Sequence, residues 1–280
     1  MNVLLEPFQS GFFRDGMLVA TIAGALCGLV GVYVVLRGLS YIGHGLSHAV
    51  FGGAVASSVV GVNVLAGAAV WGFASALMIN GITRRRAIGG DAAIGVITTA
   101  AFALGVVLIS VKRSFTQNFE ALLFGNVLGV ETTDIVVVAV VALLAVTVVF
   151  LAYRPLLFVT FDPEVAEASG LKTARLDALF ALVLAMTIIA TMRVLGVTLI
   201  AATLVLPAVV ARMLTNSFAR MLWLATLIGA LCGLVGMYLS WYTDAASGAT
   251  IVLTGAALFA VVFTVTGARA RRRLGHAHIG

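Results

Sequence analysis

Two histidines four residues apart interrupt an apolar stretch of this sequence, in the segment SYIGHGLSH at residues 40–48. Side chains four positions apart on a helix share one face, with Cβ atoms about 5 to 6 Å apart. His44 and His48 can therefore converge on one divalent ion, and neutral imidazole is a good ligand for Zn²⁺. Two ligands make a weak site, which suits transport because the ion must also be released. The alternative is that the imidazoles bond backbone groups or the hydroxyls of Ser40 and Ser47, and so tie this helix to its neighbours.

The composition predicts an integral membrane protein. Of the 280 residues, 62% are hydrophobic and 10% are charged, against roughly 25% charged in an average soluble domain; the mean hydropathy is +1.15. A membrane-spanning helix needs about 20 apolar residues, so the chain has no room for a separate soluble domain. The net charge of +6 comes from arginines clustered at the ends of apolar segments, which indicates topology rather than binding to nucleic acid.

Apolar runs separated by glycine, proline or charge predict an all-α, polytopic membrane protein with about eight or nine transmembrane helices. If the crossings alternate, most basic residues fall on one side, which the positive-inside rule assigns to the cytoplasm. We therefore expect the N-terminus outside, a transmembrane domain over residues 1–267 and a basic cytoplasmic tail at residues 268–280. Lys112, Arg113 and Arg193 break the rule, so one short span could be re-entrant. The candidate spans are residues 17–36, 42–60, 62–80, 91–111, 132–152, 176–192, 195–211, 220–240 and 248–267.

The eight-residue segment GALCGLVG occurs twice, at residues 24–31 and 229–236. In the expected topology the two copies run in opposite directions, as in the inverted repeats of transporters, although in a chain with 30 glycines the match can also be coincidence. In either case the small-x-x-x-small spacing lets helix backbones approach closely. We interpret both segments as helix packing faces, and their cysteines, Cys27 and Cys232, as packing residues rather than disulfide or metal ligands.

The longest polar connection follows the fifth span. Asp162 is a suitable N-cap and Pro163 suits the first position of a helix. Glu164 and Glu167 favour the positive end of the helix dipole, and Gly170 can end the helix. The sequence therefore predicts a short amphipathic helix at the cytoplasmic surface, which is either a functional element or an ordinary capped connector.

The chain lacks the G-x-x-x-x-G-K-[ST] phosphate loop, since neither of its lysines, Lys112 and Lys172, follows a glycine. If ATP drives this protein, another chain must bind it, and we expect no catalytic residue here. An intramembrane zinc hydrolase is also excluded. It would need a general base beside the metal, as in H-E-x-x-H, and no acid lies between His44 and His48.

The order and spacing of several motifs resemble the permease subunits of the bacterial zinc, manganese and iron uptake ABC transporters (ABC-3 type). The resemblance covers nearly the whole chain. In one place the chain departs from the family pattern, because many members carry an aspartate where this chain has His44, followed four residues later by the histidine that corresponds to His48. The matching stretches are VVLR (34–37), GHGLSHAV (43–50), IGV (94–96), LFGNVLG (123–129), FDPE (161–164), LGVTLI (195–200), LPA (206–208) and SGAT (247–250).

The resemblance implies a permease in the bacterial plasma (inner) membrane that works with three kinds of partner. These are a second permease subunit, expected to form a homodimer, a cytoplasmic ABC ATPase dimer and an extracytoplasmic metal-binding protein that delivers the ion. The resemblance also implies that residues 162–171 form the coupling helix, which fits a groove on the ATPase and carries its closure to the membrane helices. The coupling residues would be Asp162, Pro163, Glu164, Glu167 and Gly170.

We therefore expect an importer that moves Zn²⁺ or Mn²⁺ to the cytoplasm by alternating access, with His44 and His48 as ligands and with no permanently bound cofactor. An imidazole in place of a carboxylate favours zinc slightly over manganese. The alternative is an ion-coupled secondary carrier working alone, but a carrier needs intramembrane acids, and the chain offers few beyond Asp91 and Asp177. We leave open whether Arg193 pairs with an acid at the outer face or lines the ion path. We interpret the acids expected on the outer side as solvated, or as contacts for the delivery protein; these acids are Glu120, Glu131, Asp134 and Asp244.

Overall fold

The computed structural model describes residues 3–84, 90–111 and 119–277, and no β-strand occurs among them. Nine long helices of this described part each overlap one of the nine spans expected from the sequence. They are α1 (Gly11–Leu36), α2 (Ser40–Val60), α3 (Val64–Arg84), α4 (Gly90–Val111), α6 (Thr132–Leu151), α9 (Thr173–Leu195), α10 (Ile200–Leu214), α11 (Phe218–Thr243) and α12 (Ser247–Ala277). The short elements are η1 (Val3–Gln9), α5 (Phe119–Phe124), η2 (Val127–Gly129), α7 (Tyr153–Phe161) and α8 (Pro163–Ala168).

The chain is a polytopic all-α membrane protein. Within the described ranges, six helices are long and apolar enough to cross a membrane, namely α1, α3, α6, α9, α11 and α12. Shorter apolar stretches lie in α4 and α10, whereas α2 is not among the six although it has 21 residues. Helix α12 ends at Ala277, so residues 268–277 of the expected tail continue the last helix, and residues 278–280 lie outside the described part.

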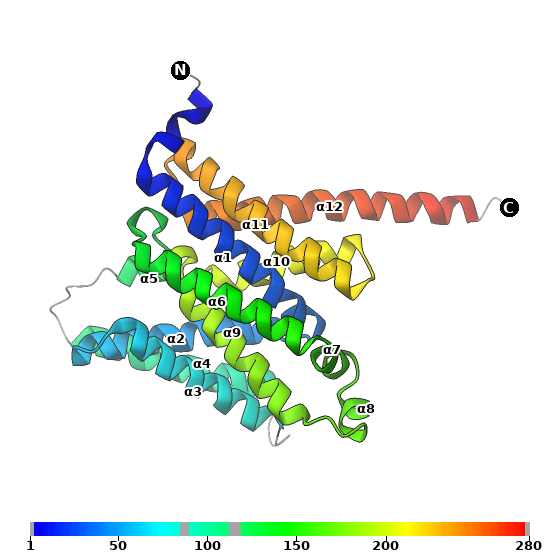
Figure 1. The fold of residues 1–280 in the computed structure, drawn as a ribbon, viewed down its shortest axis with the longest axis horizontal. Coiled ribbons are helices and arrows are strands. Elements are labelled where there is room, and N and C mark those ends of the chain that lie inside the picture. The colour runs from blue at the N-terminus through cyan, green and yellow to red at the C-terminus, as the bar shows by residue number, and fades with distance from the viewer. Residues whose placement is uncertain (1–2, 85–89, 112–118, 278–280) are drawn as a thin grey trace.

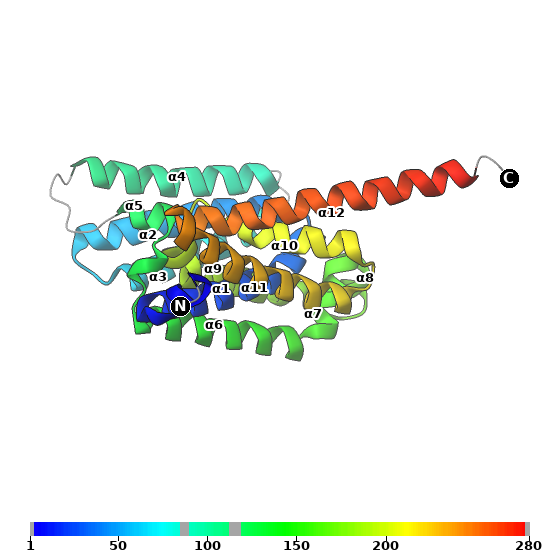
Figure 2. The same ribbon diagram turned by 90° about the horizontal axis from the view of Figure 1, so that it is seen from above.

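Helices α1 and α9 form the interior of the bundle. Figure 1 shows α1 and α11 side by side through its middle, with α8 at one end and α12 extending past the other helices. Figure 2 shows α4 and α6 on opposite sides of the bundle. The buried share of the membrane-spanning stretch is 72% in α1 and 67% in α9, but only 17% in α6. Helix α6 therefore presents most of its surface outward.

Small residues let α1 and α11 pack backbone against backbone. A Cβ atom on Gly24 would overlap the carbonyl group of Gly229, and a Cβ atom on Gly229 would overlap that of Gly24. Gly233, one turn later on α11, meets Ala20, one turn earlier on α1, so the two helices are antiparallel. The two copies of the repeated octapeptide thus contact each other, and their interpretation as packing faces is confirmed. The cysteine in each copy is buried and free.

The helix that carries the histidines, α2, is held between α3 and α4. Gly52 lies against the carbonyl group of Ala101 on α4, and Gly53 lies against the side chain of Trp71 on α3. His48 and His44 lie about one and two turns before Gly52 on the same face of the helix. The glycine contact therefore places both histidines along the edge where α2 meets α4.

Short hydrogen bonds tie α5 to the corner between α9 and α10. The N–H of Val197 donates to the carbonyl oxygen of Leu122 at 3.0 Å, and the Thr198 hydroxyl donates to that of Leu123 at 2.7 Å. Gly196 has φ of +80° and packs against the backbone at the end of α5, where a Cβ atom would overlap. Only glycine meets both conditions without strain, so this corner fixes where the chain turns back as α10.

Replacing Gly24 by leucine should force α1 away from α11, because the new side chain would overlap the backbone of α11. We expect the free energy of unfolding to fall by about 1 to 3 kcal/mol, the usual range for overpacking a core. Thermal unfolding of the purified protein in detergent measures the change. Gly81→Leu is the matched control, since nothing lies within 4 Å of the Cβ position there. Equal destabilisation by the two substitutions would show that the glycine contact does not matter.

Candidate functional site

His44 and His48 face each other across one turn of α2. Their Nε2 atoms are 3.3 Å apart, and their ring planes cross at 85° with centroids 4.6 Å apart. Two nitrogens that bind one Zn²⁺ at 2.0 to 2.1 Å in tetrahedral geometry would be about 3.3 to 3.4 Å apart. The imidazoles are therefore spaced as two ligands of one ion would be. In the absence of an ion, one ring can donate its Nε2–H to the other, in whichever tautomers the pair adopts.

The immediate surroundings of the histidine pair are mostly apolar. The ring of His48 stands edge-on to Phe102 of α4, with centroids 4.9 Å apart. The Nδ1 atom of His48 is buried and has no hydrogen-bond partner among the described residues, whereas metal-binding histidines usually donate their second ring N–H. The Ser47 hydroxyl donates to the backbone carbonyl of His44 at 2.7 Å. Ser47 is thus engaged by backbone and does not tie an imidazole to a neighbouring helix.

The histidines open into a cavity of about 600 Å³ between α2 and α4. Tyr41, Thr98 and Thr99 also line it, and the Thr98 hydroxyl donates to the carbonyl of Ile94 within its own helix at 2.7 Å. Among the described residues no third His, Cys, Asp or Glu joins the pair. His44 is exposed at this edge. The described part of the chain therefore supplies two of the usual ligands of a metal ion at this cavity.

Arg37, which caps the C-terminus of α1, connects α7 with α9. Its Nε donates to Thr160 Oγ1 at 3.0 Å, and its Nη1 donates to Asp177 Oδ1 at 3.0 Å. The guanidinium group also lies over the ring of Phe180, 4.8 Å from its centroid. The side chains of Arg37 and Asp177 are 9% and 25% exposed. This is a largely buried ion pair, and loss of either partner would leave an uncompensated charge.

A second cavity, of about 440 Å³, lies between this ion pair, α2 and the start of α8. Ile42 and Leu46 line it from α2, and Pro163 lines it from α8. Helix α2 therefore separates two cavities, with its histidines lining one and its apolar side chains lining the other. The start of α8 and the apolar side of α2 therefore border the same space.

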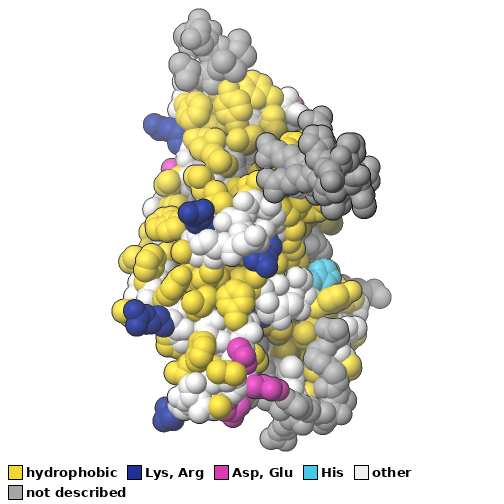
Figure 3. All heavy atoms as spheres, turned by 90° about the vertical axis from the view of Figure 1, so that its right-hand side faces the viewer, with side chains coloured by type: hydrophobic (Ala, Val, Ile, Leu, Met, Phe, Trp, Pro, Cys, Tyr) yellow, Lys and Arg dark blue, Asp and Glu magenta, His cyan; other side chains and the backbone are white. Residues whose placement is uncertain are grey.

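The short helix expected after the fifth span is present as α8. Asp162 Oδ1 accepts a hydrogen bond from the N–H of Val165 at 3.0 Å, and Pro163 is the first helical residue. Gly170 follows the helix with φ of +85°, and both glutamates of the helix are exposed. Figure 3 shows most of the Asp and Glu side chains of this face together in its lower part, with Lys and Arg side chains spread over the face.

At the opposite end of the bundle, Arg193 pairs with Asp134 across an Nη1 to Oδ1 distance of 2.7 Å. Asp134 also accepts a hydrogen bond from the N–H of Glu131 at 3.0 Å and so caps α6. Glu131 and Asp244 are exposed, and the side chain of Glu120 lies outside the described part. Arg193, whose role the sequence left open, forms an ion pair that joins the end of α9 to the start of α6.

Sequence reasoning left open a pairing of Arg193 with an outer acid without choosing the acid, and it did not identify the pair of Arg37 with Asp177. The partners are 140 residues apart in Arg37–Asp177 and 59 residues apart in Arg193–Asp134. The signal that could have suggested them is an isolated charge within or beside an apolar span, since such a charge requires a partner. Which acid meets which arginine depends on the helix packing.

Known proteins resemble this chain over almost its whole length. Residues 9–266 match the ABC 3 transport family. The manganese transport system membrane protein MntC of Halalkalibacterium halodurans is 37% identical over 252 residues, which cover 90% of this chain and 86% of that protein. The chelated iron transport system membrane protein YfeC of Yersinia pestis is 34% identical over 266 residues, covering 94% and 89%.

A solved structure has a similar fold over almost the whole chain. The structure of PsaBC from Streptococcus pneumoniae in complex with Fab matches with a TM-score of 0.83 and 31% sequence identity, over 93% of this chain and 94% of that one. The family match extends from before α1 into α12, so it includes both histidines and α8. The chain therefore belongs to the ABC 3 transport family.

Proposed function

We propose that this chain is the membrane-spanning subunit of an ATP-driven importer, which moves a divalent transition-metal ion into the cytoplasm by alternating access. The observation that carries the proposal is the 3.3 Å separation of the His44 and His48 Nε2 atoms, which suits two ligands of one ion. Polar groups inside membrane spans are expensive and tend to be functional. The relatives named for manganese and chelated iron transport support this class of substrate.

The donor set and the relatives favour different ions. Two imidazoles favour Zn²⁺ over the harder Mn²⁺, whereas several relatives are named for manganese. The resemblance places an aspartate at the position of His44 in many members of the family. We therefore propose Zn²⁺ or Mn²⁺ as the substrate. We further propose that the side chain at position 44 determines which of the two ions is preferred.

A second permease subunit, which we propose to be another copy of this chain, would complete the site. His44 is exposed on the single chain, and its cavity opens between α2 and α4. If two copies face each other along these helices, imidazoles from both would line one pathway, and a two-fold axis would bury the same patch on each copy. Two ligands from each copy would enclose the ion while leaving it releasable.

We propose that the end of the bundle with α8 lies in the cytoplasm, with the N-terminus outside and the C-terminus inside. The positive-inside rule supports this orientation. The helix ends on the α8 side carry most of the basic residues, while Glu131, Asp134 and Asp244 lie at the other end. The basic residues on the α8 side are Arg37, Arg154, Lys172, Arg175, Arg212 and Arg220.

In this mechanism ATP is hydrolysed on a partner, a cytoplasmic ABC ATPase dimer, since the sequence of this chain has no phosphate loop. Helix α8 is the proposed coupling helix. It follows α7 directly, and α7 is hydrogen-bonded through Thr160 to Arg37, which in turn holds Asp177 on α9. Closure of the ATPase would therefore reach α1 and α9, the interior of the bundle, through these bonds. An extracytoplasmic binding protein would deliver the ion at the opposite end.

The alternative is a stand-alone, ion-coupled carrier. Such a carrier needs intramembrane acids that can change their protonation or ion occupancy. Asp177 is held by Arg37 at 3.0 Å, and the side chain of Asp91 lies outside the described part. The repeated octapeptide, which would suit a carrier, is accounted for by helix packing. Active transport by this chain purified without an ATPase would favour the carrier and contradict the importer.

Replacing either histidine by alanine should lower metal uptake about ten- to a hundredfold, the range typical of a disturbed metal site. The measurement is ATP-dependent uptake of radioactive zinc and manganese by vesicles that contain the complete importer and its delivery protein. Thr99→Ala is the control, because Thr99 lines the same cavity without a ring nitrogen. Unchanged uptake of both ions in His44→Ala and His48→Ala would place the site elsewhere.

His44→Asp should shift the competition between the two ions towards manganese, because a carboxylate is a harder ligand than imidazole. The measurement is the concentration of unlabelled manganese that halves zinc uptake, compared between the variant and the original chain. His44→Asn is the control for loss of the ring without gain of a charge. A ratio that does not change would mean that residue 44 has no part in selectivity.

Reversing the charge of α8 with Glu164→Lys and Glu167→Lys together should weaken binding of the ATPase by about tenfold or more, because misplaced charges at an interface are costly. The fraction of ATPase that copurifies with the tagged permease measures this, alongside uptake. Glu131→Lys, at the opposite end, is the matched control. If both variants retain the ATPase equally well, α8 does not form the contact.

A further inference from the structure

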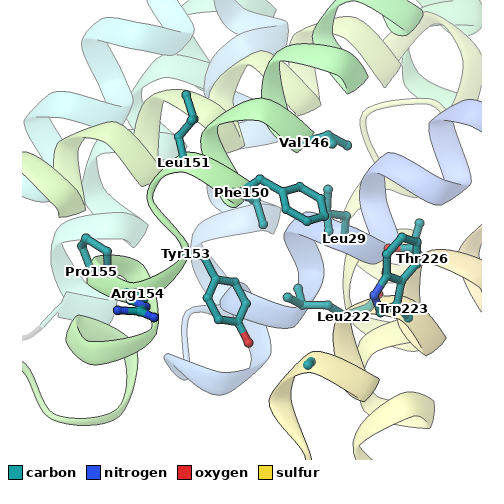
Figure 4. A pocket seen from close by; sticks show the side chains of 12 residues that line it. Leu29, Val146, Phe150, Leu151, Tyr153, Arg154, Pro155, Leu222, Trp223 and Thr226 are labelled. Atoms are coloured by element: carbon teal, nitrogen blue, oxygen red, sulfur yellow. The ribbon is translucent and has the colours of Figure 1, made fainter.

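A cavity of about 770 Å³ lies away from the histidines, between the end of α6, α7 and the start of α11. Figure 4 shows its walls, with Phe150 beside Leu29 on one side and Trp223 on the other. The Thr226 hydroxyl, which also lines the cavity, donates to the backbone carbonyl of Leu222 at 2.8 Å, so its proton is already used within the helix. The cavity is a groove with walls that are almost entirely apolar.

One end of this groove is positively charged. Arg154, the second residue of α7, lines it, is exposed and has no ion pair or hydrogen bond within the described ranges. Arg220 lies one turn before Trp223 on α11 and therefore on the same helix face. Helix α6 runs towards the α8 end and α11 runs away from it, so both arginines lie at the same end of the groove. Among the residues that the structure describes, no Asp or Glu lines the groove.

The groove opens outward near the end of a membrane span. Phe150 and Trp223 are 62% and 70% exposed, and α6 is the least buried of the six spanning helices. Arg154 comes three residues after the end of α6, and tryptophan favours the level of the lipid head groups. Figure 2 places α6 on the side opposite to α4. Two copies that face each other along α2 and α4 would therefore leave this groove uncovered.

We propose that this groove binds an anionic phospholipid. One acyl chain lies between Phe150 and Trp223, and the phosphate of the head group is bound by Arg154, whose planar guanidinium can donate two hydrogen bonds to it. Arg220 lies at the same end but does not line the groove, so Arg154 is the cation that contacts the phosphate. The apolar walls accept an acyl chain of any phospholipid. The site therefore distinguishes lipids by the net charge of their head groups.

Trp223 lies inside the groove and can report on it directly. With Trp71→Phe and Trp241→Phe, the two other tryptophans of the chain are removed. The permease with its ATPase is reconstituted in phosphatidylcholine vesicles that contain rising fractions of acyl-brominated phosphatidylglycerol or acyl-brominated phosphatidylcholine, since bromine quenches tryptophan on contact. We expect half-maximal quenching at an about fivefold lower fraction of the anionic lipid, the effect of one cation near a lipid head group.

Arg154→Gln should abolish this preference while leaving the maximal quenching unchanged, and Arg154→Lys, which keeps the charge, should retain it. Arg175→Gln is the matched control, because Arg175 is exposed at the same end but does not line the groove. Three results would overturn the proposal. The first is quenching by neither lipid, which would mean that protein covers the groove. The second is equal quenching by both lipids. The third is an equal loss of preference in Arg154→Gln and Arg175→Gln, which would mean a general surface-charge effect.

Discussion

Close contact between helix backbones at glycine determines how this bundle is assembled. Lipid tails are as apolar as leucine, so the burial of apolar side chains cannot by itself select which helices pair in a membrane. In this bundle, glycines determine which helices pair, because they have no side chain to keep the backbones apart. These contacts are Gly24 with Gly229 between α1 and α11, Gly31 with Leu204 between α1 and α10, and Gly52 with Ala101 between α2 and α4. The first two contacts put α1 at the centre. The third sets the edge along which the histidines lie.

The sequence predicted most of the architecture, because the signals for it are local. Apolar runs marked the long helices, and Asp162 with Pro163 marked the start of α8. The two octapeptides were expected to run in opposite directions and to be packing faces, but the sequence did not predict that they pack against each other. The ion pairs, the glycine corner at Gly196 and the two cavities beside α2 could not be predicted, since each depends on how distant segments pack. The spacing of the two imidazoles was expected from helix geometry, whereas the orphaned Nδ1 of His48 depends on what α4 places against it.

The histidine pair has the character of half a binding site. Its two nitrogens are correctly spaced for one ion, yet no further ligand of the usual kinds joins them within the described residues, and one of the two rings is exposed. Such a site binds an ion tightly only when further ligands complete its coordination. On the opposite flank of the same helix, Ile42 and Leu46 border the cavity that reaches Arg37 and α8. Helix α2 thus lines both the cavity of the proposed ion site and the cavity that reaches α8, so the coupling that we propose would act through it.

The composition of α2 also bears on how the protein is made. Its glycines, serines and histidines leave it outside the set of helices that are apolar enough to cross a membrane, whereas its chain neighbours α1 and α3 reach mean hydropathies of 2.3 and 1.6. A translocon inserts a segment according to the free energy of transferring that segment into lipid. The lower hydropathy of α2 makes this free energy less favourable than for α1 or α3. We expect α2 to enter the bilayer paired with α3, through the contact at Gly53 and Gly67. If His44 and His48 bind an ion as we propose, the same side chains would make membrane insertion of α2 depend on the helix that follows it from the ribosome.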